Sequence, residues 1–267
     1  MLIEEYFGFK KHPFLNTIDL EFLFWSKEFK EGYARLLYSI IESKTGLSLI
    51  LGEIGCGKTM LCKALQKDIE ERNLRVCVIE NPLLSPKEFL INLILSFFNE
   101  EIKGTKAYLF KEIEKRVKKE DKGYAVLIDE AQILSSKIFE EIRLLLNIEK
   151  KEGKILNVVL FGQMDLKKKL KKEIALKQRV GISYTLLPLN KEETKEYINH
   201  RLKVAGKEEE IFNEKAIEEI YNFTNGIPRL INIICSNSLF AGFMREKRKI
   251  DEEIVKIVIE DYKRNLE

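Results

Sequence analysis

The sequence predicts an α/β fold, in which a parallel, five-stranded, doubly wound sheet is followed by an all-helical domain. Five short β-prone runs alternate with helical patterns in the first two thirds of the chain. Four of these runs are almost continuously apolar, which is typical of strands buried on both faces of a parallel sheet. After Pro188 the strand patterns stop and only helical periodicity remains. The alternation therefore favours helices on both faces of one sheet, with a second domain after it.

The elements follow in order along the chain. A first helix is expected over residues 27–43, because Ser26 is a suitable N-cap and apolar residues recur with helical spacing from Leu36 to Ile41. The five strands are predicted at residues 47–51, 76–79, 124–128, 155–161 and 182–186. Four later helices are predicted at residues 191–204, 213–223, 228–243 and 251–262.

These elements divide the chain into three predicted regions. Residues 1–45 are an N-terminal linker and the first helix, which we expect to pack on the α/β core. Residues 46–189 are that core, and residues 190–267 are the helical domain. Only the short turn LLPLN joins the last two regions, so we expect them to pack against each other.

Composition excludes several classes of protein. With 45% hydrophobic and 33% charged residues, the chain can bury a sizeable core and is not disordered. A net charge of +3 is too mild to indicate a nucleic-acid partner by itself. The four cysteines form no CxxC pair and no zinc pattern, and the N-terminus lacks the features of a signal peptide, so we expect a cytoplasmic protein. The apolar stretches 89–98 and 226–244 are too short or too interrupted to span a membrane.

The strongest chemical signal is a glycine-rich loop between the first strand and the next helix. It reads G-x-x-x-x-G-K-T, the pattern of a phosphate-binding P-loop. Glycines let such a loop curl its backbone N–H groups toward phosphate oxygens, while Lys58 would hold the β- and γ-phosphates and Thr59 would ligate Mg²⁺. The sequence therefore predicts that ATP or ADP binds with Mg²⁺. The residues predicted to bind the nucleotide are Gly52, Glu53, Ile54, Gly55, Cys56, Gly57, Lys58, Thr59 and Met60.

Two adjacent carboxylates end the strand at residues 124–128. The carboxyl end of a parallel strand lies at the same edge of the sheet as the predicted loop. Asp129 is therefore predicted to hold the water shell of Mg²⁺, together with Thr59. Glu130 would face the γ-phosphate and act as the general base for the attacking water.

Several segments together resemble a known family. These segments are the loop, LIDEAQ, VVLFGQ, LKQRV, GIPRLIN and the N-terminal YFGFKKHPF. In this order they look like AAA+ ATPases of the general secretion pathway protein A type, a group that includes short relatives from type IV pilus gene clusters. The resemblance covers nearly the whole chain. It implies a P-loop core followed by a helical AAA+ lid.

The resemblance also implies roles for three residues outside the two nucleotide motifs. Gln163 resembles the sensor-1 residue that helps to place the water, and Arg179 resembles an arginine finger that acts on the neighbouring subunit's nucleotide. Arg229 resembles the sensor-2 residue, which contacts nucleotide from the lid. The N-terminal segment is implied to lie near the adenine. Residues 12–14 therefore either contact the base or pack under the lid.

The function implied is a Mg²⁺-dependent AAA+ ATPase that couples its nucleotide state to rearrangement of an oligomer or partner in secretion or type IV pilus assembly. Such an enzyme is expected to form an ATP-dependent homo-oligomer or ring, to meet envelope proteins, and to reach the inner membrane only through partners. One alternative is a DNA-associated ATPase of the transposition-regulator or origin-recognition type. The lysine run at 167–172 does not favour it, because no aromatic residues interleave. A third reading is a nucleotide-gated scaffold with negligible turnover.

Overall fold

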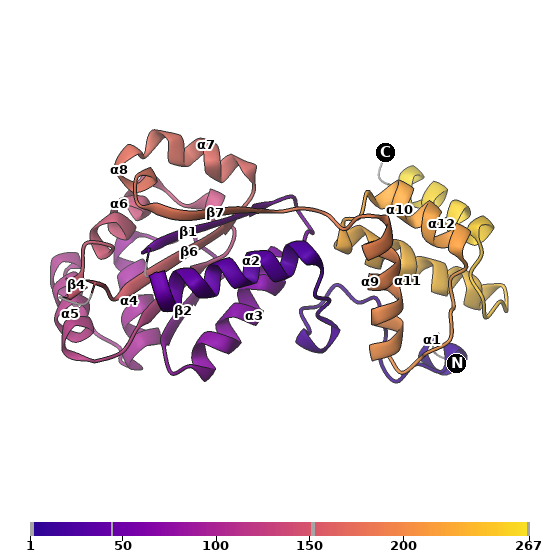
Figure 1. Cartoon of the computed structure of the whole chain (residues 1–267), viewed down its shortest axis with the longest axis horizontal. Coiled ribbons are helices and arrows are strands. Elements are labelled where there is room, and N and C mark those ends of the chain that lie inside the picture. The colour runs from indigo at the N-terminus through magenta and orange to yellow at the C-terminus, as the bar shows by residue number, and fades with distance from the viewer. Residues whose placement is uncertain (1–2, 44, 151–152, 266–267) are drawn as a thin grey trace. The chain divides into compact units, whose positions relative to one another are not determined.

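The chain divides into two compact units, each with its own core. A computed structural model describes residues 3–43, 45–150 and 153–265 (Figure 1). One unit comprises Lys27–Ile54 and Lys58–Leu186 and contains the sheet. The other comprises Met1–Ser26, Gly55–Gly57 and Leu187–Glu267 and is helical.

The first unit contains the five-stranded parallel sheet that the sequence predicts. Its strands lie in the order β2-β3-β6-β1-β7, and every neighbouring pair is parallel (Figure 1). The strands are β1 (Leu47–Gly52), β2 (Arg75–Ile79), β3 (Tyr124–Ile128), β6 (Leu156–Gly162) and β7 (Val180–Leu186). A short antiparallel pair, β4 (Glu149–Lys150) and β5 (Gly153–Lys154), was not predicted. The predicted fold class is confirmed.

Burial explains the composition of the strands. Every residue of β1, β3 and β6 is buried, since these strands lie inside the sheet and are covered on both faces. β7 forms an edge and stays half-exposed over most of its length. It begins two residues before the predicted run, at Val180, and its register against β1 shifts after Leu47.

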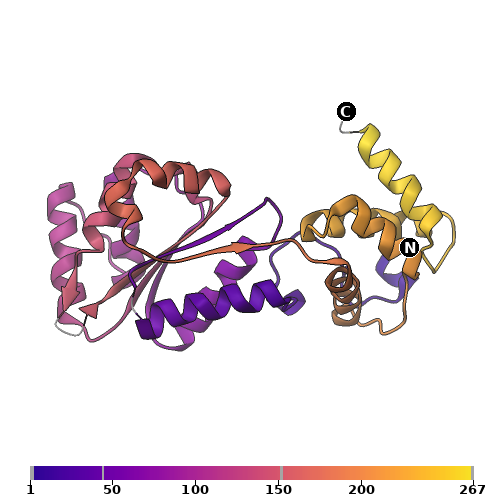
Figure 2. The ribbon, with the colours of Figure 1, turned by 45° about the horizontal axis from the view of Figure 1, so that its top comes forward.

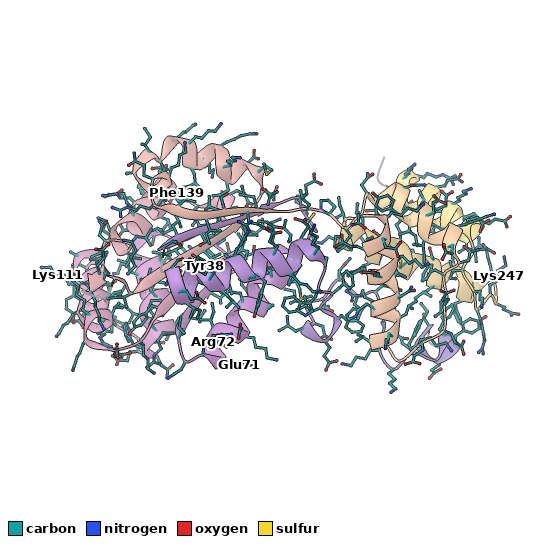
Figure 3. The ribbon with its side chains drawn as sticks, in the orientation of Figure 1. Tyr38, Glu71, Arg72, Lys111, Phe139 and Lys247 are labelled. Atoms are coloured by element: carbon teal, nitrogen blue, oxygen red, sulfur yellow. The ribbon has the colours of Figure 1, made fainter. Side chains whose placement is uncertain are left out.

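Helices cover both faces of this sheet (Figures 1 and 2). The helices of this unit are α2 (Lys27–Leu37), α3 (Lys58–Glu71), α4 (Pro86–Phe98), α5 (Lys106–Lys119), α6 (Ser136–Leu145), α7 (Met164–Lys172) and α8 (Ile174–Lys177). Helices α4 to α8 share one apolar core with alternate residues of the strands. Phe139 of α6, which is 1% exposed, is among its largest buried side chains (Figure 3). Helices α2 and α3 contact each other, and α2 packs on β7 where Gly32 meets the Tyr184 ring.

The helix predicted over residues 27–43 is present, but it changes pitch. Its last six residues, Tyr38–Ser43, form a π-helical turn (η2). The buried Ser39 hydroxyl lies 2.7 Å from the Ser48 hydroxyl and 2.6 Å from the Thr45 hydroxyl. These polar contacts join the end of this helix to β1.

The helical unit contains four long helices, as predicted after Pro188. They are α9 (Lys191–Val204), α10 (Glu214–Thr224), α11 (Pro228–Met244) and α12 (Glu252–Arg264). Side-chain caps explain three of the starts: Asn190, Asn213 and Asp251 each accept a hydrogen bond from a backbone N–H in the first turn. Within the described ranges, no helix combines the length and the apolar character that crossing a membrane requires.

The N-terminal segment belongs to the core of the helical unit. It includes the short helices α1 (Ile3–Phe7) and η1 (Leu20–Phe22). Four of its aromatic side chains are buried with α9 to α12; they are Phe7, Phe9, Phe14 and Phe22. The observed division therefore differs from the predicted grouping of residues 1–45, because these aromatic rings complete the apolar core of the helical unit, whereas α2 packs on the sheet.

A buried arginine fixes this segment to α9. The Arg201 guanidinium is 4% exposed and donates hydrogen bonds to the carbonyl oxygens of Pro13 (2.5 Å) and Leu15 (3.2 Å) and to the Tyr197 hydroxyl (2.9 Å). It also lies 4.7 Å from the centre of the Phe22 ring. A buried charge needs such partners, and the guanidinium in turn satisfies the backbone carbonyl of the buried Pro13.

Replacement of this arginine is expected to destabilise the helical unit. Arg201→Met keeps most of the side-chain volume but removes the hydrogen bonds to the Pro13 and Leu15 carbonyls and to the Tyr197 hydroxyl, which should cost about 3 kcal/mol or more. The melting temperature should fall by roughly 6–12 °C in differential scanning calorimetry. Arg264→Met, in the exposed last turn of α12, is the matched control and should leave the transition in place. Equal stability of the two variants would contradict this account.

Candidate functional site

The predicted phosphate loop joins the carboxyl end of β1 to the start of α3. Gly55 and Gly57 have φ angles of +86° and +95°, a left-handed backbone that favours glycine. Gly52 is required for packing, because a Cβ there would lie 2.9 Å from the carbonyl oxygen of Leu186. The pattern of glycines predicted from the sequence therefore meets real conformational needs, and the loop leads directly into a helix N-terminus.

Lys58 is the first residue of α3 and is 5% exposed. Its ammonium group donates hydrogen bonds to the carbonyl oxygens of Gly52 (3.0 Å) and Glu53 (2.8 Å). The side chain is thereby folded back over the loop, with its positive charge among the loop's own backbone groups. This arrangement fits a loop that binds phosphate.

Thr59 and Asp129 come together from different elements. The Thr59 hydroxyl donates a 2.6 Å hydrogen bond to Asp129 Oδ2, which joins the start of α3 to the end of β3. Asp129 is 5% exposed, and its Oδ1 accepts the backbone N–H of Glu130 at 2.9 Å. A hydroxyl and a carboxylate side by side are oxygen ligands that suit Mg²⁺, and phosphate and water would complete its coordination shell. No cluster of three or more His, Cys, Asp or Glu side chains arranged to hold a metal ion occurs among the described residues.

Glu130 has an unusual backbone. Its φ of +48° places a non-glycine residue in the left-handed region, directly before the short 3₁₀ turn η3 (Ala131–Ile133). Its carboxylate accepts a hydrogen bond from the Gln132 side chain. The backbone turn and this bond together fix the direction of the carboxylate at the end of β3.

Gln163 lies directly after β6, at the N-cap position of α7. Because β6 pairs with β3 on one side and β1 on the other, Gln163 lies at the same edge of the sheet as Asp129 and the loop. Its backbone N–H donates a 3.1 Å hydrogen bond to Gln132 Oε1. The topology thus brings together the residues predicted from three strand ends.

Arg179 lies at the amino ends of the strands, opposite the end of the sheet that carries the phosphate loop. It directly precedes β7, whose first residue pairs with Leu47 at the start of β1. The loop follows the other end of β1, so the two positions are separated by the length of a strand, roughly 20 Å. Within one chain the structure does not bring Arg179 to the loop. Its predicted role as a finger concerns a neighbouring subunit and stays a prediction.

Arg229 lies in the first turn of α11, after Pro228. Pro is favoured there because its missing N–H would be unpaired in any case. The predicted contact of Arg229 with nucleotide stays a prediction. Of residues 12–14, Phe14 is 2% exposed and packs edge-on against Phe212, while His12 Nδ1 accepts the Phe14 N–H at 3.1 Å. Of the two roles that the sequence left open for residues 12–14, Phe14 thus has the packing role.

Gln132 is the residue of this site to which the sequence assigned no role. It belongs to the LIDEAQ segment, yet nothing in the spacing indicates that its side chain reaches β6. Only the pairing of β3 with β6 makes that contact possible. Two features of the sequence could have indicated this role: Gln132 lies three residues after Asp129, and its amide can both donate and accept a hydrogen bond.

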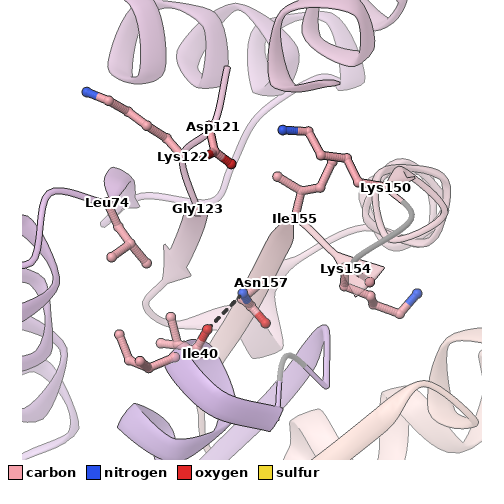
Figure 4. A pocket seen from close by; sticks show the side chains of 11 residues that line it. Ile40, Leu74, Asp121, Lys122, Gly123, Lys150, Lys154, Ile155 and Asn157 are labelled. Carbon is pink, nitrogen blue, oxygen red and sulfur yellow. Dashed lines mark hydrogen bonds between the residues drawn. The ribbon is translucent and has the colours of Figure 1, made fainter. Parts of the chain in front are cut away.

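A separate hollow of about 240 Å³ lies at the amino ends of β3 and β6 (Figure 4). Lys122, Lys150 and Lys154 surround it, but the chain's own oxygens engage their ammonium groups. Lys150 donates to the carbonyl oxygen of Glu120 at 2.5 Å, and Lys154 donates to that of Leu146 at 2.8 Å. These lysines stabilise the loops around the hollow, which lies at the edge of the sheet opposite the phosphate loop.

Comparison with known proteins identifies the fold and the domain. Residues 41–170 match the family described as AAA domain. The ORC2 protein of Aeropyrum pernix, solved in ADPNP–ADP complexes, superimposes with a TM-score of 0.70 over 94% of this chain and 72% of that chain, at 17% identity. This chain has the AAA+ fold. Its AAA domain includes the loop, Asp129, Glu130 and Gln163.

Sequence similarity reaches well beyond the AAA domain. General secretion pathway protein A of Aeromonas hydrophila is 34% identical over 254 residues, which cover 92% of this chain and 46% of that protein. An uncharacterised HTH-type transcriptional regulator of Methanocaldococcus jannaschii is 25% identical over 262 residues, which cover 83% of this chain and 64% of that protein. The resemblance predicted from the motifs is confirmed. The chain spans about half of the first relative and under two thirds of the second.

Cys62 and Cys77 are expected to be unreactive in the folded protein. Burial raises the pKa of the Cys62 thiol in α3, with the nearby Asp129 carboxylate adding to the effect, and burial raises the pKa of Cys77 in β2 to about 11. At pH 8 roughly one Cys77 thiol in a thousand would be ionised, against about one in four for an ordinary cysteine.

Alkylation with iodoacetamide at pH 8, followed by peptide mapping, checks this expectation. Cys62 and Cys77 should react at least about 100-fold more slowly in the folded protein than in urea, because the thiolate is the nucleophile. Labelling of Cys77 at the same rate in both conditions would show that the β2 thiol is neither buried nor protonated as described.

Proposed function

We propose that this protein is a Mg²⁺-dependent ATPase. The observation that carries the proposal is the cluster at one edge of the sheet. There the buried Lys58 ammonium lies over the loop, the Thr59 hydroxyl is bonded to Asp129, and the Glu130 carboxylate follows directly. Positive charge for phosphate, oxygen ligands for a cation and a candidate base are thus adjacent, which is what phosphoryl transfer to water requires.

Each residue has a distinct task in this proposal. The loop N–H groups and Lys58 bind the phosphates and neutralise part of their charge. Thr59 and Asp129 hold Mg²⁺, which lowers the charge repulsion against an incoming nucleophile when it is bound. Glu130 accepts a proton from the attacking water, and Gln163 helps to orient that water.

The proposed active unit is a homo-oligomer. Arg179 lies a strand's length from the loop of its own chain, so we propose that its guanidinium acts on a nucleotide held by another copy. A planar guanidinium with fixed donors suits the charge that develops on a transferring phosphoryl group. Arg229 would contribute from the helical lid, at the start of α11.

We propose that hydrolysis drives rearrangement of an oligomer or partner in secretion or type IV pilus assembly, at the cytoplasmic side of the envelope. The 34% identity with general secretion pathway protein A supports this role, since it extends over 92% of the chain. The solved structures similar to this chain include ORC bound to DNA, but at 17% identity they support only the fold. A DNA-associated role would instead appear in the turnover assays as ATP hydrolysis that increases with duplex DNA and decreases with added salt.

Separation of binding from turnover tests the ATPase assignment. Glu130→Gln should bind a fluorescent ATP analogue like the wild type and release phosphate about 10²- to 10⁴-fold more slowly, because the general base is lost. Lys58→Ala should lose binding itself, since the loop backbone alone does not offset the clustered phosphate charge. Turnover of Glu130→Gln within a factor of about two of the wild type would show that Glu130 is not the base. Wild-type protein that binds the analogue but never exceeds background phosphate release would favour a nucleotide-gated scaffold.

Mixing of two inactive variants tests the arginine finger. Arg179→Ala should keep ATP binding and lose hydrolysis, and wild-type specific activity should rise with protein concentration. Addition of Lys58→Ala subunits should restore part of the activity, because some interfaces then join an intact loop to an intact finger. Full turnover by Arg179→Ala at every concentration would remove Arg179 from the mechanism.

A further inference from the structure

The Gln132 side chain bridges two strand ends of the candidate site. Its Nε2 donates to Glu130 Oε2, and its Oε1 accepts the backbone N–H of Gln163 at 3.1 Å. The two contacts define the amide orientation, because a rotated amide would direct an N–H at the Gln163 N–H and an oxygen at the Glu130 carboxylate. One side chain thus holds both residues at once.

We propose that Gln132 is a positioning residue for hydrolysis: it fixes the Glu130 carboxylate and couples that carboxylate to the end of β6 at Gln163. The inference rests on the proposed ATPase function. A carboxylate with free rotation would spend much of its time away from the attacking water, whereas an amide donor restricts it to one direction. Because the other end of Gln132 is held by the backbone of β6, a displacement of Gln163 would also displace Glu130.

Gly162 leaves the space that this bridge needs. A Cβ at Gly162 would lie 3.0 Å from Gln132 Oε1 and 2.8 Å from Leu166 Cδ2. Its φ angle is not in the left-handed region, so the requirement for glycine here is one of space. The glycine of VVLFGQ therefore serves the Gln132 contact and the packing of α7.

The bridge also completes a continuous chain of hydrogen bonds. The Thr59 hydroxyl donates to Asp129, whose second oxygen accepts the Glu130 N–H. The Glu130 carboxylate accepts from Gln132, and Gln132 accepts from Gln163. The start of α3, the end of β3 and the end of β6 are thereby linked through side chains. Gln132 is the member of this chain whose removal separates the proposed base from β6 without touching the phosphate loop.

A double-mutant cycle in turnover tests the proposal. Gln132→Met keeps the length of the side chain and removes both hydrogen bonds, so kcat should fall about 10- to 100-fold with an unchanged KM for ATP. In the Glu130→Gln background the same substitution should lower kcat less than about twofold, since the carboxylate that Gln132 positions is already absent. Gln66→Met is the matched control, because Gln66 also donates to a glutamate, Glu70, at 2.9 Å on the exposed side of α3. It should keep wild-type kcat.

Gln132→Glu separates the two bonds. It retains an oxygen that accepts the Gln163 N–H, loses the donor to Glu130 and places a like charge against the Glu130 carboxylate, so its kcat should fall at least as far as that of Gln132→Met. Wild-type kcat in Gln132→Met, or equal losses with and without the Glu130 carboxylate, would overturn the proposal. Absence of any ATP turnover by the wild type would instead contradict the proposed function, so the two failures are distinguishable.

Discussion

The pairing of β6 between β1 and β3 is the constraint on which the rest of the sheet unit depends. Parallel strands that lie side by side direct their carboxyl ends to one edge, so three loops that are distant in sequence meet there. Each strand is buried on both faces, and a shift of register by one residue would exchange its two faces between different helical layers. The packing that stabilises the sheet therefore also sets the positions of Thr59, Asp129 and Gln163.

Hydrogen bonds within the chain restrain the side chains at this edge of the sheet. Asp129 uses both of its oxygens within the chain, one for the Thr59 hydroxyl and one for the Glu130 N–H. Glu130 adopts a left-handed backbone that costs about 1 kcal/mol or more outside glycine. Such strain persists only where surrounding contacts hold it, and here the hydrogen bond from Gln132 and the η3 turn do so. This strain is one reason to propose a catalytic role for Glu130.

The helical unit is stabilised by a different principle. Its core combines four helices with aromatic side chains from the other end of the chain, and the buried Arg201 guanidinium bonds to the irregular backbone of the N-terminal segment. Arg201 accomplishes this because its planar fork can donate to Pro13, Leu15 and Tyr197 at once, which a lysine could not match. The N-terminal segment thus depends on α9 for its conformation.

The sequence by itself determined the five strands, the later helices, the phosphate loop and the pair Asp129–Glu130, because apolar periodicity and glycine spacing act locally and leave a direct trace in the order of residues. It also indicated the family, since several short segments follow one another in the order that is typical of that family. It did not determine that four N-terminal aromatic residues belong to the helical core, because the sequence does not show which distant surface an aromatic side chain packs against. These residues are Phe7, Phe9, Phe14 and Phe22. Nor did the sequence indicate the role of Gln132, whose two partners meet only when β3 and β6 pair. Contacts between segments far apart in the chain depend on strand order and packing, and these were decided by the tertiary structure.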